Sequence, residues 1–191
     1  MNIFVLDDDP VIAAQLQCDK HVVKMIVESA QMLSTVHRML DGTEKRKPSK
    51  SGKTTVKYYE LPDMREDILY KAVHFNHPCT VWSRESCCNY SWHYEHFIAL
   101  CEEYTYRYGK IHSTETKLRD ILKNLPTNIN RAGGMTPFKL AMKSNPECVV
   151  HGLGGTDAVK SYQKFYKTKE ARFSMTWSKR KTPEWFINGV V

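Results

Sequence analysis

The sequence has few of the features that mark membrane-spanning proteins, secreted proteins or zinc proteins. Its 191 residues contain no run of 18 apolar residues, the length that a membrane-spanning helix needs. The first nine residues have no basic stretch and include three aspartates, which is untypical of a secretory signal. The six cysteines form no C-x-x-C pair, which argues against structural zinc and favours reduced thiols. We therefore expect a cytoplasmic protein that does not bind a membrane.

Motifs for phosphate loops, hydrolases and catalytic metals are also missing. The glycine pairs at 133–134 and 154–155 fit neither G-x-x-x-x-G-K-[ST] nor G-x-G-x-x-G, and G-x-S-x-G and H-E-x-x-H do not occur. His74 and His77, like His93 and His96, have a spacing that suits one metal ion, but no acidic residue or cysteine stands at a diagnostic offset. We expect no metal and no cofactor.

Positive charge is concentrated in two segments of the chain. The net charge is +7, to which residues 43–57 and residues 157–191 each contribute +5, while the remainder sums to −3. Aromatic residues alternate with the cations of the C-terminal block, a composition that suits phosphates and stacked bases. The alternatives are that basic loops keep the protein soluble and that the aromatic residues pack on the core. If these segments bind nucleic acid, the residues expected to contact it are Lys45, Arg46, Lys47, Lys179, Arg180 and Trp185.

Hydrophobic periodicity and capping signals predict a mainly α, single compact domain over residues 1–191, with irregular loops and at most a short strand or two. Residues 43–55 are expected to form a basic mobile loop, and residues 172–191 a basic aromatic tail. Residues 126–156 are predicted to be an irregular connection. The expected helices cover residues 10–17, 19–40, 63–73, 76–108 with a kink or break near residue 91, 113–124 and 157–171.

The helix predicted over residues 19–40 carries a polar stripe opposite its apolar one. His21, Lys24, Glu28 and Gln31 lie on this stripe at helical spacing. One interpretation is a solvated face with an ordinary ion pair between Lys24 and Glu28. The other is that a further element covers the stripe, so that a desolvated lysine becomes a nucleophile beside a carboxylate. Lys20, Asn76, His77 and Arg84 are further candidates for phosphate contact, His77 because it starts a predicted helix.

Three sequence blocks resemble a known family. They are Asp19-Lys20-His21-Val22-Val23-Lys24 through Glu28-Ser29-Ala30-Gln31-Met32-Leu33, Asn76-His77-Pro78-x-x-x-Trp82, and Cys101-Glu102-Glu103-Tyr104. In order and rough spacing they are similar to the pyrimidine dimer DNA glycosylases, or endonuclease V-like proteins, of phages and bacteria. The short segment from Lys181 to Phe186 is similar to the aromatic C-terminal segment of the phage enzyme.

The resemblance implies a mostly helical enzyme that excises a damaged or modified pyrimidine from duplex DNA and needs no cofactor. An N-terminal amine attacks the sugar, an imine forms, and β-elimination breaks the strand, while a glutamate stabilises the sugar cation. Glu28 matches that carboxylate, with Lys24 and His21 beside it. If the chain is phage-encoded, the compartment is the host cytoplasm.

The second residue departs from the family pattern. The family's nucleophile needs a small second residue, so that the initiator methionine is removed, whereas residue 2 here is Asn. The amine of Met1, a lysine such as Lys24, or water activated by Glu28 therefore all stay open as the nucleophile. Two rival functions also stay open: an enzyme that processes a nucleotide or hypermodified base, and a non-enzymatic phage protein that binds nucleic acid or a small phosphorylated nucleotide to counter host defence.

Overall fold

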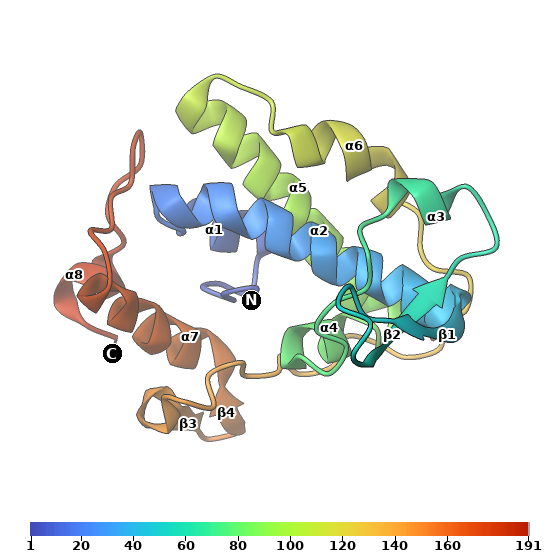
Figure 1. Ribbon diagram of the computed structural model, residues 1–191. Helices are drawn as coiled ribbons and strands as arrows, with labels where there is room; N and C mark the ends of the chain where they lie inside the picture. The colour runs from blue at the N-terminus through green and yellow to red at the C-terminus, as the bar shows by residue number, and fades with distance from the viewer. Residues whose placement is uncertain (191) are drawn as a thin grey trace.

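Helices dominate the structure, a computed structural model that describes residues 1–190 (Figure 1). Two small antiparallel sheets, each of two strands, complete it. In chain order the elements are α1 (Pro10–Gln15), α2 (Asp19–Asp41), β1 (Thr43–Pro48), β2 (Thr55–Glu60), α3 (Arg65–Ile68), α4 (Pro78–Ser83), α5 (Cys87–Tyr108), α6 (Ser113–Leu122), the 3-10 helix η1 (Pro146–Cys148), β3 (Val150–Gly152), β4 (Gly155–Asp157), α7 (Ala158–Lys167), the 3-10 helix η2 (Thr168–Ala171) and α8 (Glu184–Asn188).

The fold class predicted from the sequence is wrong. About 49% of the chain is helix, but 9% is strand, in two sheets, so the fold is mixed α/β although largely helical. The expected basic mobile loop over residues 43–55 is instead most of a hairpin, in which Thr43 pairs with Glu60 and Pro48 with Thr55. Lysines at alternate positions hid the strand pattern, because they leave no apolar face for periodicity to detect.

Helix α2 is the longest element, and its apolar stripe was predicted correctly. Val22, Ile26, Leu33 and Val36 are completely buried. The helix packs against α5, and α1 also packs against α5 (Figure 1). Residues 3–6, which precede α1, are also buried and run through the middle of the molecule. The core therefore lies between α2, α5 and the first residues of the chain.

The helix expected over residues 76–108 is broken at residues 84–86 rather than near residue 91. Helix α4 ends at Ser83, and α5 begins after Ser86, whose side chain accepts a hydrogen bond from the backbone amide of Asn89. Such an N-cap starts a new helix because it satisfies a backbone donor that has no partner within the helix. Helix α5 ends at Gly109, whose φ of 66° is the left-handed conformation that favours glycine.

The helix expected over residues 63–73 is reduced to the four residues of α3. The side chain of Arg38, only 1% exposed, donates to the backbone carbonyls of Glu66, Leu69 and Tyr70. These bonds satisfy carbonyl groups that a longer helix would have paired internally. A buried arginine thus fixes an extended chain where local sequence favoured a helix.

The C-terminal part contains the predicted last helix as α7 followed by η2, and the side chain of Asp157 caps α7 by accepting a hydrogen bond from the backbone amide of Lys160. The tail after it returns to the body. The indole nitrogen of Trp177 donates to the carbonyl of Leu16, and Ser178 donates to the carboxylate of Asp19 from both its backbone amide and its hydroxyl. Within residues 1–190, none of the helices combines the length and apolar character required to cross a bilayer.

Candidate active site

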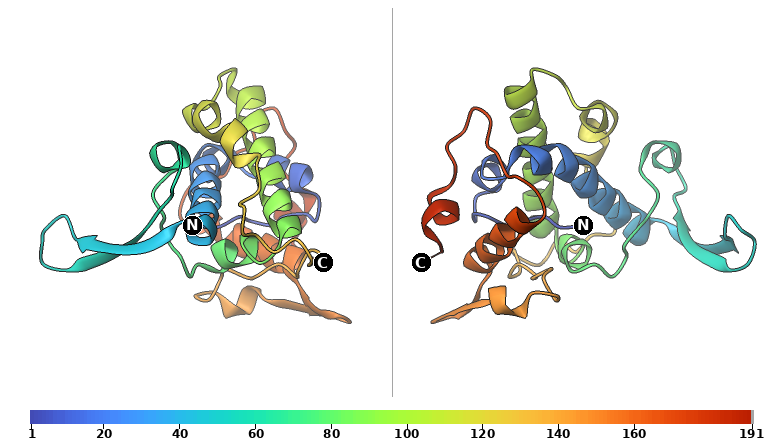
Figure 2. Two further views of the ribbon diagram at one scale, coloured as in Figure 1. Left: turned by 90° about the vertical axis from the view of Figure 1, so that its right-hand side faces the viewer. Right: turned by 60° about the vertical axis from the view of Figure 1, so that its left-hand side comes forward.

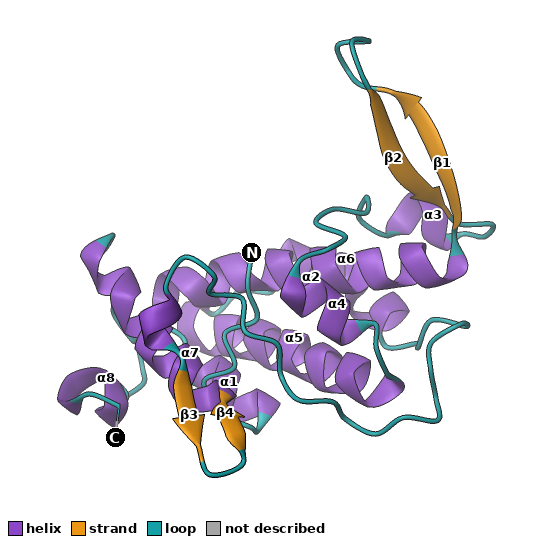
Figure 3. Cartoon of the chain, turned by 90° about the horizontal axis from the view of Figure 1, so that it is seen from below, coloured by secondary structure: helices purple, strands orange, loops and turns teal. Residues whose placement is uncertain are grey.

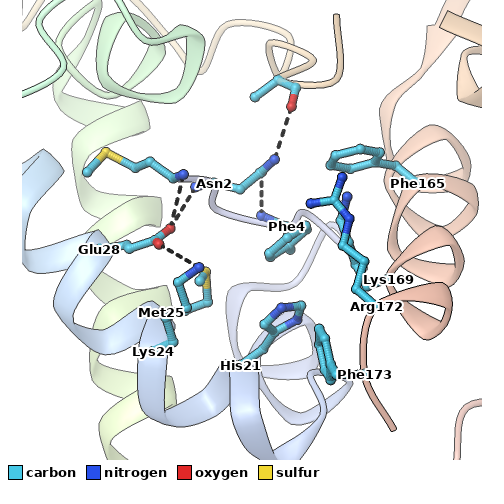
Figure 4. A pocket seen from close by; sticks show the side chains of 12 residues that line it. Asn2, Phe4, His21, Lys24, Met25, Glu28, Phe165, Lys169, Arg172 and Phe173 are labelled. Carbon is cyan, nitrogen blue, oxygen red and sulfur yellow. Dashed lines mark hydrogen bonds and ion pairs between the residues drawn. The ribbon is translucent and has the colours of Figure 1, made fainter. Parts of the chain in front are cut away.

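A pocket of about 340 Å³ opens between the start of the chain, α2 and the end of α7 (Figure 4). Its size is at the lower end of the range for small-molecule sites. It brings together residues that are up to 172 positions apart in the sequence. The lining residues are Met1, Asn2, Phe4, His21, Lys24, Met25, Glu28, Ala141, Phe165, Lys169, Arg172 and Phe173.

An amine and a carboxylate face each other in this pocket. The α-amino nitrogen of Met1 lies 3.5 Å from Oε2 of Glu28, whose side chain is 13% exposed. The same oxygen accepts a hydrogen bond of 3.0 Å from the backbone amide of Asn2. The other oxygen, Oε1, lies 3.2 Å from Nζ of Lys24. Glu28 therefore lies between two amines, and Figure 4 shows Glu28 and Lys24 on the same side of the pocket.

The side chain of Asn2 holds the first residues in this position. Its Nδ2 donates to the carbonyl of Ala141 at 3.1 Å, and its Oδ1 accepts from the backbone amide of Phe4 at 3.0 Å. Phe4 has a φ of 54°, a left-handed conformation that is uncommon for a bulky residue. The turn directs the Phe4 ring into the core and the amine of Met1 toward Glu28.

His21 forms part of the wall as a neutral imidazole. It is 6% exposed, stacks on Phe4 at 4.9 Å between ring centroids, and meets Phe173 edge-on at 5.3 Å. Burial, together with the charges of Lys24 and Lys169, lowers the pKa of His21 to about 4. Its Nδ1 has no hydrogen-bond partner within residues 1–190. The ring thus offers one unused polar atom inside an aromatic wall.

Cations surround the opening. Lys169 comes from η2 and Arg172 directly follows that helix, whereas Lys24 comes from α2. Burial and the charge of Arg172 lower the pKa of Lys169. Lys20 lies next to the pocket with Nζ 5.0 Å from the centre of the Phe173 ring. The opening can therefore attract an anionic group such as a phosphate.

The structure brings together the four residues that the sequence predicted as catalytic, namely Met1, His21, Lys24 and Glu28. Gln31 lies farther along α2, half-buried, and does not line the pocket. Burial lowers the pKa of His77, and the charges of the Met1 amine and of His74 lower it further.

The two residues before α4 have separate environments. Nδ1 of His77 accepts a hydrogen bond from the backbone amide of Cys79 and caps α4. Asn76 is exposed.

Four other predicted contact residues are engaged within the protein, away from the pocket. Arg84 donates to the carbonyl of Phe75, and Lys179 to that of Tyr106. Arg180 forms an ion pair with the buried Glu103, and Trp185 packs edge-on against Tyr166. The contacts of Lys179, Arg180 and Trp185 attach the tail to α5 and α7. This agrees with the alternative that the aromatic residues of the tail pack on the core.

The remaining predicted residues lie on the β1–β2 hairpin. Lys45 pairs with Glu60, Lys47 lies over the Tyr58 ring, and Arg46 is exposed. In the described chain, which ends at Val190, no cluster of three or more histidines, cysteines or carboxylates could hold a metal ion.

The sequence predicted only four of the twelve residues that line the pocket. Phe165 and Phe173 were noted only as aromatic residues of the C-terminal block, and Phe4, Lys169 and Arg172 were not singled out. The charge of residues 157–191 was noted as a block, but no pattern in it singled out Lys169 and Arg172. Asn2 was considered only for its effect on methionine removal, although its side chain positions the amine.

The chain matches no family model, no curated protein and no solved structure. The interpretation of the pocket therefore depends on its own chemistry.

Proposed function

We propose that this protein is a DNA glycosylase with lyase activity, and that the amine of Met1 attacks the sugar of a damaged or modified pyrimidine nucleotide. The observation that supports this most directly is the distance of 3.5 Å between that amine and the carboxylate of Glu28, inside a pocket with a cationic opening. A covalent amine catalyst needs a neighbouring base of this kind.

The reaction would begin with a proton transfer from the Met1 ammonium to Glu28. The neutral amine then attacks C1′, an N–C1′ bond forms, and the bond between C1′ and the base breaks. The departing base takes the electron pair, and it takes the proton that the newly bonded, positively charged nitrogen loses. Opening of the sugar ring leaves a protonated imine on Met1, and the negative charge of Glu28, once it has given its proton to the ring oxygen, stabilises that cation. Glu28, ionised again, then takes a proton from C2′, and β-elimination expels the 3′ phosphate, which breaks the strand.

Two observations favour Met1 over Lys24 as the nucleophile. The side chain of Lys24 is 63% exposed, whereas that of Met1 is 5% exposed, so the Met1 amine lies on the protected side of the carboxylate. As a class, α-amines lose their proton nearer to neutral pH than lysine side chains do. Lys24 would instead pair with Glu28 and contact a phosphate.

The rest of the pocket suits a nucleotide turned out of the duplex. Phe4, His21 and Phe173 form an aromatic wall of the pocket against which a base can lie. Lys169 and Arg172 at the opening suit the flanking phosphates. Extrusion costs a few kcal/mol, which such contacts can offset.

The same size and charge also favour a second candidate, a protein that binds a small phosphorylated nucleotide without chemistry. A pocket of about 340 Å³ with Lys169 and Arg172 at its edge can take a free nucleotide. The two candidates differ in whether a covalent adduct forms.

The test is incubation with end-labelled duplexes that each carry one modified pyrimidine, starting with a cyclobutane thymine dimer, with and without borohydride. We expect excision, strand breakage and a trapped adduct whose modified peptide begins at Met1. A protein carrying one extra residue before Met1 should lose the adduct, whereas Lys24→Met should keep it.

An adduct on Lys24 would overturn the assignment of Met1. If the folded protein released no base from any duplex and trapped none, the glycosylase proposal would be wrong. A rise in melting temperature with nucleoside monophosphates would then support the second candidate.

A further inference from the structure

The β1–β2 hairpin, residues 43–60, stands away from the helices as an arm (Figures 2 and 3). Every residue of β1 is exposed, and so are the first three of β2. A two-stranded ribbon that packs on nothing gains little from burial and is marginally stable by itself. The arm therefore contributes little to the stability of this fold.

The root of the arm, by contrast, is firmly attached. Nη1 of Arg38 donates to the carbonyl of Tyr59 at 3.1 Å, and the Tyr59 ring meets Phe75 edge-on at 5.4 Å. At Gly42, a Cβ atom would lie only 2.5 Å from the carbonyl oxygen of Arg38 in α2 and 3.0 Å from that of Glu60 in β2, so α2 and the arm approach as closely as glycine permits. An exposed ribbon on a fixed root has a defined direction relative to α2.

The charges of the arm divide into paired and free groups. Six residues of the arm are basic and two are acidic. Lys45 pairs with Glu60 and Lys57 with Glu44, across the two strands. Three other cations, Arg46, Lys50 and Lys53, form no ion pair or hydrogen bond within residues 1–190 and are exposed. Two of these three lie in the turn at the tip.

The tip has the chemistry of a phosphate contact. Residues 49–54 read Ser-Lys-Ser-Gly-Lys-Thr, with no apolar or acidic member. The turn is closed by its own backbone, since the amide of Ser49 donates to the carbonyl of Thr54 and that of Gly52 to the carbonyl of Ser49. A tip that inserted into a lipid surface would carry apolar or aromatic side chains. Lysines and hydroxyls on a ribbon suit the sugar–phosphate backbone instead.

We propose that the β1–β2 arm is a second contact with duplex DNA, a ribbon that lies in the major groove and holds phosphates with Arg46, Lys50 and Lys53. The major groove admits a two-stranded ribbon. This inference extends the proposed function, since it names a contact outside the pocket, but binding of undamaged duplex tests it without any excision.

The experiment measures binding of a fluorescein-labelled, undamaged duplex of about 20 base pairs by fluorescence anisotropy at several salt concentrations. The variant is Lys50→Gln with Lys53→Gln, two exposed turn residues, so its melting temperature should equal that of the wild type. The matched control is Lys110→Gln with Lys160→Gln, which removes the same charge from exposed positions outside the arm.

We expect the arm variant to bind roughly 10- to 100-fold more weakly at about 0.1 M salt, and the slope of log K against log salt to shrink by about 2. The control should change affinity by less than about threefold. An arm variant with unchanged affinity and slope, or with a loss no greater than the control's, would overturn the proposal. So would loss of binding to phosphatidylserine vesicles with duplex binding intact.

These outcomes are separable from those of the glycosylase test. Absence of excision with arm-dependent duplex binding rejects the chemistry and supports the arm. Excision with arm-independent binding does the reverse.

Discussion

Oε2 of Glu28 accepts a hydrogen bond from the backbone amide of Asn2 and, 3.5 Å away, faces the amine of Met1. One carboxylate oxygen therefore both holds the first peptide bond in place and balances the charge of the residue before it. The same oxygen thus has a structural role and a proposed chemical role. Substitutions of Glu28 and of Asn2 can test the two roles separately.

Replacing Glu28 with Gln keeps the size of the side chain and an oxygen that can accept from the Asn2 amide. It removes the negative charge that would take a proton from Met1 and stabilise the imine. We expect base excision to fall by about 10²- to 10⁴-fold, with duplex affinity within about threefold of the wild type. Single-turnover kinetics on the modified duplex measure this, and a fall of less than tenfold would contradict the role of Glu28.

Replacing Asn2 with Leu should misplace the amine and weaken the fold. Leu is large enough to retain the initiator methionine, but it leaves the amide of Phe4 and the carbonyl of Ala141 without their partner. We expect a loss of about 1–3 kcal/mol in the free energy of unfolding, measured with denaturant, and a slower excision rate. The exposed Asn124→Leu is the control, and an equal loss in both variants would count against an anchoring role for Asn2.

Arg38→Met should be among the most destabilising single changes. The buried guanidinium satisfies the carbonyls of Tyr59, Leu69 and Tyr70, and it pairs with Glu66. Methionine fills the space but donates nothing, so the free energy of unfolding should fall by about 3–5 kcal/mol. Lys71→Met removes the exposed partner of the same glutamate and should cost less than about 1 kcal/mol. Similar losses in calorimetry for both variants would contradict this.

Acid should unfold the protein through buried histidines such as His37. Burial, and secondarily the charge of Arg65, lower the pKa of His37 to about 4, and its Nε2 bonds the hydroxyl of Tyr90 at 2.8 Å. Below its ordinary pKa of 6.5, the unfolded chain binds a proton that the folded chain does not. Stability is therefore complete above about pH 6.5 and falls as the pH drops toward about 4, by roughly 3 kcal/mol for this group.

Denaturant titrations between pH 7 and 4 measure this dependence. His21 and His96, whose pKa values burial also lowers to about 4, contribute in the same direction. In His37→Gln the slope of stability against pH should decrease by the equivalent of about one proton. A slope identical to that of the wild type would show that His37 does not titrate in this window.

Local patterns in the sequence predicted the helices that bury one face, and with them part of the pocket. The spacing of His21, Lys24 and Glu28 put the three on one stripe of α2, and the structure has them there. Whether the stripe was covered depended on contacts that no local pattern contains. Ala141 and Lys169 complete the pocket from more than 110 positions away.

The arm eluded prediction for a different reason. Its cross-strand pairs, Lys45 with Glu60 and Lys57 with Glu44, are 15 and 13 positions apart and become visible only when the register is known. A ribbon exposed on both faces has no hydrophobic alternation, which is the main signal for a strand. The helix expected over residues 76–108 is likewise interrupted before the N-cap at Ser86, because hydrophobic periodicity is judged over a long window and does not detect a single capping residue.

Helix α2 connects the pocket to the arm without interruption, and this sets a spacing. Glu28 and Asp41, the last residue of the helix, are 13 residues apart, which corresponds to roughly 20 Å at a rise of about 1.5 Å per residue. Stacked duplex covers that length in about six base pairs at about 3.4 Å each. If the pocket takes a nucleotide and the arm binds the groove, the length of α2 sets the distance between these two contacts on the DNA. The protein should then protect the duplex from nuclease farther on one side of the reacting nucleotide than on the other.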